Sequence, residues 1–310
     1  MSATALGLLV GAALDQVLPD PRRGHPVALF GSVAARVERS LYRDSRVAGT
    51  GYAAALVGGS ALLGWGFTRA SGARLFALTA AGTWAVLVGR SLAAEAAEVR
   101  SRLSGGDLPA ARQRLTHLVG RRTDELDESE IARAAVESVA ENTCDAVVAP
   151  LFWGALFGLP GLLAYRAVNT LDAMVGHHNP RYEQFGWASA RADDVANFVP
   201  ARLTAVLTAL AAPVVGGSSD GVLRVARTDG RRHPSPNSGM SEAAFAGALG
   251  IRLGGVNDYG SHVESRPVLG AAGHAPVAAD LGRTARLSRA VGAFAAVLAA
   301  GFALWRKGDR

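Results

Sequence analysis

The sequence of 310 residues contains very little lysine and cysteine. Its only lysine, Lys307, stands near the end of the chain, which argues against a Walker-type phosphate loop and against a Schiff-base lysine. Its only cysteine, Cys144, excludes an intramolecular disulfide framework and any zinc or iron–sulfur site that needs several cysteines.

Aromatic residues are also scarce, at 6% of the chain. The formal net charge is +6, but the basic residues are scattered among Asp and Glu. A nucleic-acid surface combines a basic stripe with stacking side chains. We therefore expect no nucleic-acid partner.

Charged residues make up 19% of the chain, below the quarter usual for soluble domains, while hydrophobic residues make up 49%. The predicted membrane segments lie near residues 4–18, 48–68, 75–89, 146–165, 203–219 and 290–305. The run 48–68 has no charge and is long enough, at about 1.5 Å per residue, to cross a hydrocarbon core of about 30 Å. In the run 146–165, Pro150 and Pro160 would kink the helix or let it turn back.

These runs predict an all-α fold, a polytopic integral membrane helical bundle with polar helical loops. We expect a single membrane-embedded domain over residues 1–310. The abundance of glycine in the runs suits close helix packing in lipid. The alternative is a large soluble bundle in which the same runs are buried helices.

Carboxylates and amides gather in the polar stretches beside these runs. Asp127 and Glu130 have the spacing of a capping box, which begins a helix carrying Glu137, Glu141 and Asp145 on one face. A second group follows the run 146–165 and precedes the run 203–219, and its oxygen ligands suit Mg²⁺. The predicted metal ligands are Asp145, Asn169, Asp172, Asp193, Asp194 and Asn197. The alternatives are a solvated helix face for the first row and an ion-pair network at helix ends for the second group.

A polar loop, "HPSPNSG" over residues 233–239, precedes a helix of small residues. The amino end of such a helix can bind an anion, so the loop is a candidate phosphate cradle. The predicted substrate- and phosphate-binding residues are Arg166, Arg191, Arg202, Arg231, Arg232, Ser235 and Asn237. The alternative is a turn that only caps the helix.

Taken together, these motifs resemble the CobD/CbiB family of cobalamin biosynthesis, the adenosylcobinamide-phosphate synthases. The resemblance runs from "LDQVLPDPRRGHPVALFG" near the N-terminus through "NTLDAMVG" and "FGWASARADDVANFVPAR" to "HPSPNSG". It covers most of the chain in the same order. Cys144 stands where the family pattern has serine, and residues 255–276 follow the pattern loosely.

The resemblance implies a multi-pass enzyme of the cell (inner) membrane. The enzyme would form an amide between the propionate carboxylate of adenosylcobyric acid and (R)-1-amino-2-propanol or its O-phosphate, with ATP as co-substrate and Mg²⁺ as cofactor. Its partners would be the corrinoid, the amino alcohol, membrane lipid and other late enzymes of the cobalamin pathway. The residues that we assign to catalysis are His233, Asp194 and Glu141, since the reaction needs a base for the amine proton.

Two other classes of function remain. A Mg²⁺-dependent intramembrane transferase of prenyl or phosphoalcohol groups would also place Asp-rich motifs at helix ends. Its motifs differ, because Asn169 and Asp172 lack the regularly spaced Asp partners that such motifs have. A non-catalytic membrane scaffold for corrinoid assembly would not need the polar loops to carry out chemistry.

Overall fold

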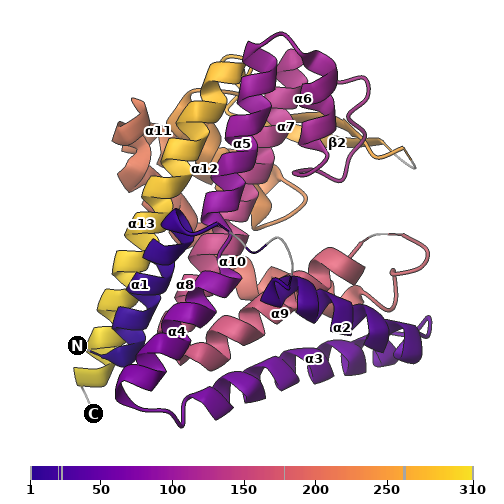
Figure 1. Cartoon of the computed structure of the whole chain (residues 1–310). Helices are drawn as coiled ribbons and strands as arrows, with labels where there is room; N and C mark the ends of the chain where they lie inside the picture. The colour runs from indigo at the N-terminus through magenta and orange to yellow at the C-terminus, as the bar shows by residue number, and fades with distance from the viewer. Residues whose placement is uncertain (1, 20, 22–23, 178, 261–262, 309–310) are drawn as a thin grey trace. The chain divides into compact units, whose positions relative to one another are not determined.

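The computed structural model describes residues 2–19, 21, 24–177, 179–260 and 263–308. Its elements form two compact units. Unit 1 comprises Met1–Val88, Asp145–Asn197 and Ala295–Arg310, and unit 2 comprises Gly89–Cys144 and Phe198–Phe294. Nearly all elements are α-helices, which confirms the predicted fold class (Figure 1).

Unit 1 is a bundle of helices. Its complete helices are α1 (Ala3–Val17), α2 (Pro26–Leu41), α3 (Arg46–Phe67), α4 (Gly72–Val86), α8 (Ala149–Phe157) and α9 (Leu159–Val175). It also holds the first part of α10 (Trp187–Ala211) and the last part of α13 (Ala278–Gly308). A short π-helical turn, η1 (Cys144–Val148), leads from unit 2 into α8.

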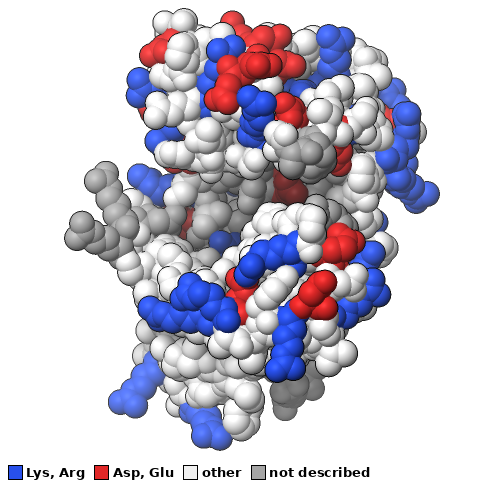
Figure 2. Space-filling view, turned by 90° about the vertical axis from the view of Figure 1, so that its right-hand side faces the viewer, with Lys and Arg blue, Asp and Glu red and all other residues white. Residues whose placement is uncertain are grey.

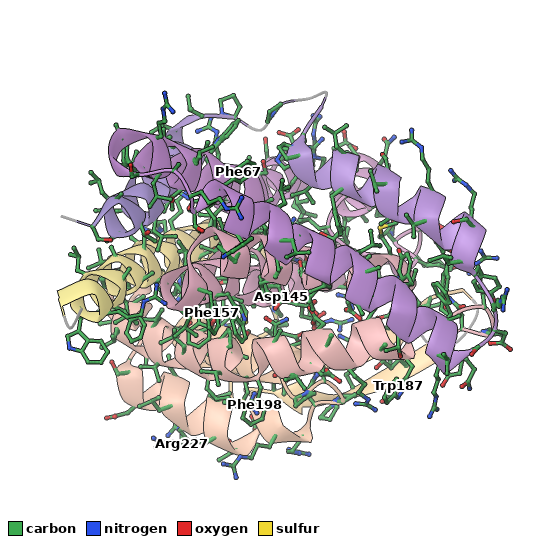
Figure 3. All side chains as sticks on the ribbon, turned by 90° about the horizontal axis from the view of Figure 1, so that it is seen from below. Phe67, Asp145, Phe157, Trp187, Phe198 and Arg227 are labelled. Atoms are coloured by element: carbon green, nitrogen blue, oxygen red, sulfur yellow. The ribbon has the colours of Figure 1, made fainter. Side chains whose placement is uncertain are left out.

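The core of unit 1 forms where α2, α3 and α9 pack together. Tyr52 of α3 is fully buried with Leu171 and Val175 of α9, and its ring centre lies 5.0 Å from that of Phe185. In Figure 3, α3 crosses the view between Trp187 and Phe67. Arg46, the first residue of α3, lies 5.1 Å from the centre of the Trp187 ring.

Helices α1 and α4 approach each other closely through small residues. Gly7 and Gly11 of α1 have the spacing of a GxxxG motif, and both are buried. A Cβ atom on Gly7 would lie 2.6 Å from Cβ of Thr79, and one on Gly11 would lie 2.5 Å from the carbonyl oxygen of Ala80. Only glycine allows this contact, as the glycine-rich apolar runs predicted.

Unit 2 contains the polar helices. Its complete helices are α5 (Gly89–Ser104), α6 (Leu108–Leu115), α7 (Glu128–Thr143), α11 (Ser219–Thr228) and α12 (Ser238–Leu249), with the 3₁₀ turns η2 (Ala212–Val215) and η3 (Gly230–Arg232). It also holds the rest of α10 and the first part of α13. Helix α7 begins with the predicted capping box, in which Asp127 and Glu130 exchange hydrogen bonds of 2.8 and 2.9 Å with each other's backbone N–H.

A two-stranded antiparallel hairpin, β1 (Leu253–Asp258) and β2 (Val263–Leu269), completes unit 2. Its register is irregular between Leu253 and Gly255, where Gly254 has a φ of +84°. The sequence analysis did not predict this hairpin. Two glycines in β1 and a proline in β2 weaken the pattern by which strands are recognised.

Four helical stretches are long and apolar enough to cross a membrane by length and composition. They are Arg46–Phe67, Gly72–Ser104, Trp187–Val215 and Ala278–Arg306. These stretches overlap the predicted segments 48–68, 75–89, 203–219 and 290–305. Along α3, Leu62, Leu63 and Trp65 are exposed, as expected of side chains that face lipid. The protein is therefore a helical membrane protein.

The other two predicted membrane segments correspond to shorter helices. The segment 4–18 forms α1, which has 15 residues. The segment 146–165 is divided between α8, with 9 residues, and α9, with 17. The break falls at Gly158, whose φ is +67°, two residues before Pro160. A positive φ and a proline both oppose a continuous helix there.

Charged side chains are mixed by sign on the face drawn in Figure 2, where blue Lys and Arg residues stand among red Asp and Glu residues. This arrangement follows the interspersed charges of the sequence.

Candidate functional site

A small polar cavity lies within unit 2, and its volume is about 140 Å³. The ionisable residues that line it are Arg121, Glu137, Glu141, Glu242, Tyr259 and Arg266. They come from α7, from α12, from the hairpin region and from the segment before α7. Unit 2 thus gathers charges of both signs around one cavity.

Glu137 holds the hairpin against α7. Its Oε2 accepts a hydrogen bond of 2.6 Å from Arg121, and its Oε1 accepts one of 2.8 Å from the backbone N–H of Gly254. Arg133 pairs with Glu137, four residues further along α7, at 3.3 Å, and donates to the carbonyl of Gly254 at 2.6 Å. Asn257 accepts from both arginines through Oδ1. Both carboxylate oxygens of Glu137 therefore accept hydrogen bonds that hold the fold together.

Glu242 of α12 differs sharply from Glu137. Its side chain is 1% exposed, and neither carboxylate oxygen has a hydrogen-bond partner among the described residues. Burial, followed by the charges of Glu137 and Glu141, raises the pKa of Glu242 well above its ordinary value. The carboxyl is therefore held protonated by its surroundings, although it lines an open space.

His233, which we assign to catalysis, lies beside Glu242. Its Nε2 is 3.9 Å from Oε1 of Glu242, too far for a hydrogen bond. Its Nδ1 lies 3.1 Å from the backbone N and 3.2 Å from the carbonyl O of Ser235, so either tautomer of the ring has a partner there, and Nε2 is the ring atom that faces the carboxyl. Burial, and then the charge of Arg266, lowers the pKa of His233, so the ring is neutral near pH 7.

Glu141, the second residue assigned to catalysis, links the cavity to the start of α12. Its Oε1 accepts a hydrogen bond of 2.7 Å from the hydroxyl of Ser238. The electrostatic influence of Glu141 reaches both His233 and Glu242. Two of the three residues assigned to catalysis thus belong to one cluster.

The "HPSPNSG" loop leads from η3 into α12. The hydroxyl of Ser235 accepts the backbone N–H groups of Asn237 and Ser238 at 3.3 and 3.1 Å, so it caps the helix. Arg202 donates to Oδ1 of Asn237 at 3.1 Å, and Arg231 lies near enough to Arg202 to repel it. Of the predicted anion-binding residues, Arg202, Arg231, Ser235 and Asn237 are therefore neighbours.

The second candidate site lies in unit 1, around Asp193. Asn197 donates to Oδ2 of Asp193 at 2.9 Å, and Asn169 donates to Oδ1 at 3.4 Å. The charge of Asp172 acts on Asp193. Four of the six predicted metal ligands therefore meet in one network, which joins α9 to the first part of α10.

Tyr165 extends this network toward Asp145. Its hydroxyl lies 2.8 Å from Oδ1 of Asn197 and 2.9 Å from the backbone carbonyl of Asp145. Figure 3 labels Asp145 in the middle of the helices of unit 1. Arg166 donates to Oδ1 of Asn169 at 3.3 Å, so one predicted anion-binding residue borders the network.

Asp194 and Arg191 pair with each other at 3.1 Å, and the side chain of Arg191 is 65% exposed. Asp194 is in unit 1, whereas His233 and Glu141 are in unit 2. Arg232, predicted beside Arg231, is exposed at the end of η3. The row of Glu137, Glu141 and Asp145 is likewise divided, because the α-helix ends at Thr143 and the π-helical turn carries Asp145 into unit 1.

The oxygen donors around Asp193 suit Mg²⁺, which takes one or two carboxylates and completes its shell with water and substrate phosphates. Within the part of the chain that the structure describes, no group of three or more His, Cys, Asp or Glu side chains is arranged to hold a metal ion. A metal at Asp193 would therefore depend on the amide oxygens of Asn169 and Asn197 as well as on carboxylates, and these two oxygens, which accept hydrogen bonds from Arg166 and Tyr165, would have to turn toward the ion.

Sequence reasoning missed Glu242, Tyr259 and Arg266. Glu242 could have been found, since it is the only charged residue in α12, a helix built otherwise of small and apolar residues. Arg266 donates to Glu264 and to the hydroxyl of Tyr259, each at 3.0 Å. Tyr259 and Arg266 belong to the segment 255–276, in which the sequence analysis found no motif.

Comparisons with a family model and with individual proteins point to the same family. The family model described as "CobD/Cbib protein" matches residues 8–288. A protein of Mycobacterium tuberculosis (strain H37Rv) with the name "Cobalamin biosynthesis protein CobD" is 53% identical over 296 residues, which cover 95% of this chain and 94% of the relative. Proteins of the same name from Geobacter metallireducens and Rhodobacter capsulatus are 46% and 42% identical and cover 87% and 91% of this chain, and 87% and 92% of their own lengths.

No solved structure matches this chain. The family model and the relatives nevertheless span both units, including the cavity of unit 2 and the Asp193 network of unit 1. The chain therefore belongs to the CobD/CbiB family.

Proposed function

We propose that this protein forms an amide bond in cobalamin biosynthesis. The bond would join the propionate carboxylate of adenosylcobyric acid to (R)-1-amino-2-propanol or its O-phosphate, in a reaction that consumes ATP in the presence of Mg²⁺. The observation that carries the proposal is the family match over residues 8–288, which gives the chain the role of a biosynthetic enzyme of the cobalamin pathway with a corrinoid-related substrate.

In the proposed reaction, the γ-phosphoryl group of ATP is transferred to the propionate carboxylate, giving ADP and an acyl phosphate. The amine nitrogen then attacks the acyl carbon, phosphate leaves, and the nitrogen gives up a proton to a base. Such a sequence needs groups that hold phosphate oxygens and a group that accepts the proton.

The Asp193 network supplies oxygen donors for Mg²⁺, which would neutralise phosphate charge during the transfer. Asp193, Asn169, Asn197 and Asp172 are the residues that would hold the ion. Arg202 and Arg231 are neighbours in unit 2 and would pair with anionic substrate groups.

His233 and Glu141 remain our candidates for proton transfer. The lowered pKa of His233 keeps its ring neutral and able to accept a proton near pH 7. We place the enzyme in the cell (inner) membrane, in contact with lipid and with other late enzymes of the pathway.

The test uses the full chain purified in detergent. Incubation with adenosylcobyric acid, the amino alcohol or its phosphate, ATP and Mg²⁺ should give the amide, detected by mass spectrometry, together with ADP. Omission of ATP or Mg²⁺ should abolish the product. If no amide forms with any of these substrates, or if it forms equally without ATP, the proposal is wrong.

The Asp193→Asn variant tests the metal site. Removal of one carboxylate charge should lower turnover by about 10- to 100-fold and raise the Mg²⁺ concentration needed for half-maximal activity. Asp220→Asn is the matched control, because Asp220 is an exposed residue in the first turn of α11. Normal turnover of Asp193→Asn at limiting Mg²⁺ would move the metal site elsewhere.

A further inference from the structure

The mechanism above leaves the carboxyl of Glu242 without a role. A buried polar group without a hydrogen-bond partner costs free energy, and most proteins avoid it. Glu242 is 1% exposed, both its oxygens are unpartnered among the described residues, and it lines a cavity of about 140 Å³. The carboxyl therefore lacks a partner among the described residues, and its residue borders a space that can hold a small ligand.

The charges around the cavity favour a cation. Three carboxylates line the cavity, namely Glu137, Glu141 and Glu242, together with two guanidinium groups, those of Arg121 and Arg266. His233 is neutral. With every carboxyl ionised, the cluster would hold one negative charge in excess, and this excess is balanced by a ligand that carries one positive charge.

A metal ion suits this cavity poorly. Arg121 and Arg266 both line it, and guanidinium groups repel a divalent cation. In addition, the described residues include no group of three His, Cys, Asp or Glu side chains that would ligate one. An ammonium group carries a single charge and three N–H donors, so it matches a carboxylate with two vacant oxygens.

We propose that this cavity binds the protonated amino group of a small amine, with Glu242 as its counter-ion. The inference rests on the proposed function in one respect, which is that we take the amine to be the amino alcohol or its O-phosphate. The guanidinium groups of Arg121 and Arg266 also line the cavity and would donate to the hydroxyl or phosphate oxygen of the same molecule.

Glu141 is the second carboxylate of this amine site. One of its oxygens accepts from Ser238, and the residue lines the cavity. His233 lies 3.9 Å from Glu242. The amine would therefore be held beside the two residues that we assign to proton transfer, which is where its nitrogen must lose a proton before it forms an amide.

The site makes a distinctive prediction about protons. Near pH 7 a free primary amine is protonated, and the burial of Glu242 together with the charges of Glu137 and Glu141 raises its pKa and favours its protonated form in the empty cavity. In the bound pair the amine keeps its proton and Glu242 has lost the proton that it carried in the empty cavity. Binding should therefore release about one proton for each amine. The other groups that face Glu242, Arg121, Arg266, Tyr259 and His233, keep their charge states.

The test is titration calorimetry of the full chain in detergent, with (R)-1-amino-2-propanol as the probe and propane-1,2-diol as its neutral analogue. Two buffers with different ionisation enthalpies report the proton release. We expect the amine to bind with release of about one proton. The diol should bind at least about tenfold more weakly, because it lacks the charge that pairs with Glu242.

Glu242→Gln keeps the shape of the side chain and removes its charge. This variant should bind the amine at least about tenfold more weakly and release no proton. Glu125→Gln, which changes an exposed carboxylate before α7, should behave as the wild type. In the amide assay, Glu242→Gln should raise KM for the amine and leave KM for the corrinoid unchanged. Circular dichroism of both variants verifies folding.

The outcomes separate the two proposals. If the wild type makes the amide but Glu242→Gln binds the amine normally or releases the same proton, the amine site is wrong and the function stands. If the wild type binds the amine through Glu242 but makes no amide, the function is wrong and the site stands. Absence of any amine binding to the wild type also overturns the site.

Discussion

Glu242 illustrates how the burial of a single carboxyl shapes both stability and chemistry. An ionised carboxylate without a partner is strongly disfavoured away from water, so the native protein retains this proton at pH values where the unfolded chain has released it. The retained proton makes the stability of the native state depend on pH.

Glu242→Gln should stabilise the ligand-free protein, and the gain should grow with pH. The pKa of Glu242 is raised above its ordinary 4.5 in the native protein. The wild type therefore loses stability as pH rises from the pKa of the unfolded chain to the raised pKa of the native state, by up to about 1.4 kcal/mol for each pH unit. Glutamine does not titrate. Thermal unfolding at about pH 5 and about pH 8 should show the larger advantage of the variant at the higher pH.

Glu125→Gln serves as the control for this comparison, since Glu125 is exposed. A gain for Glu242→Gln that is equal at both pH values would mean that Glu242 titrates normally in the native protein. A destabilised Glu242→Gln would instead mean that the carboxyl has a structural partner.

Local residue pairs could be predicted from the sequence, whereas distant ones could not. The Asp127–Glu130 capping box and the Arg133–Glu137 pair follow from spacings of three and four residues along one helix. Glu242 comes from α12, whereas Tyr259 and Arg266 come from the hairpin region, so their meeting depends on how α12 and the hairpin pack. The Asp193 network was predicted as a set of residues; its Asn197–Asp193 hydrogen bond joins residues four apart in α10, but its Asn169–Asp193 hydrogen bond depends on the approach of α9 to α10.

At the scale of elements, the pairing of α1 with α4 depends on the absence of side chains at Gly7 and Gly11 of α1. Side chains at Gly7 and Gly11 would occupy space that Thr79 and the backbone of Ala80 already fill. In lipid, where helices gain little from hydrophobic burial, such close approach is a main source of helix association.

Gly11→Ala should therefore destabilise unit 1 by about 1–3 kcal/mol, because the added methyl group would overlap a backbone carbonyl that cannot move without shifting α4. The matched control is Gly59→Ala in α3, where an added Cβ meets no atom within 4 Å. That change should be neutral or stabilising, by at most about 1 kcal/mol. Thermal unfolding in detergent measures both, and equal effects of the two substitutions would contradict the α1–α4 contact.

Helices were predicted well where an apolar run contains no proline and poorly where prolines interrupt it. The runs 48–68 and 290–305 lie within or along long helices, because composition alone favours a helix in lipid. The break at Gly158 was only indicated by the two nearby prolines. The hairpin escaped prediction because its stability comes from side chains of α7 rather than from its own strand pattern.

At the scale of the whole molecule, four apolar helical stretches predict firm attachment to the membrane. The protein should remain in the membrane pellet after extraction with alkaline carbonate, which removes peripheral proteins. Detergent should release it. Recovery in the carbonate supernatant would contradict the assignment of these stretches as spans.

The attachment of the hairpin to α7 has a consequence for how unit 2 opens. A hairpin of two strands has little stability of its own in water. The backbone groups of Gly254 and Val256 are bonded to Glu137 and Arg133, so β1 loses its anchor whenever α7 unfolds. Helix α7 and the hairpin are therefore one cooperative folding unit, and the cavity wall that they share exists only while both are folded.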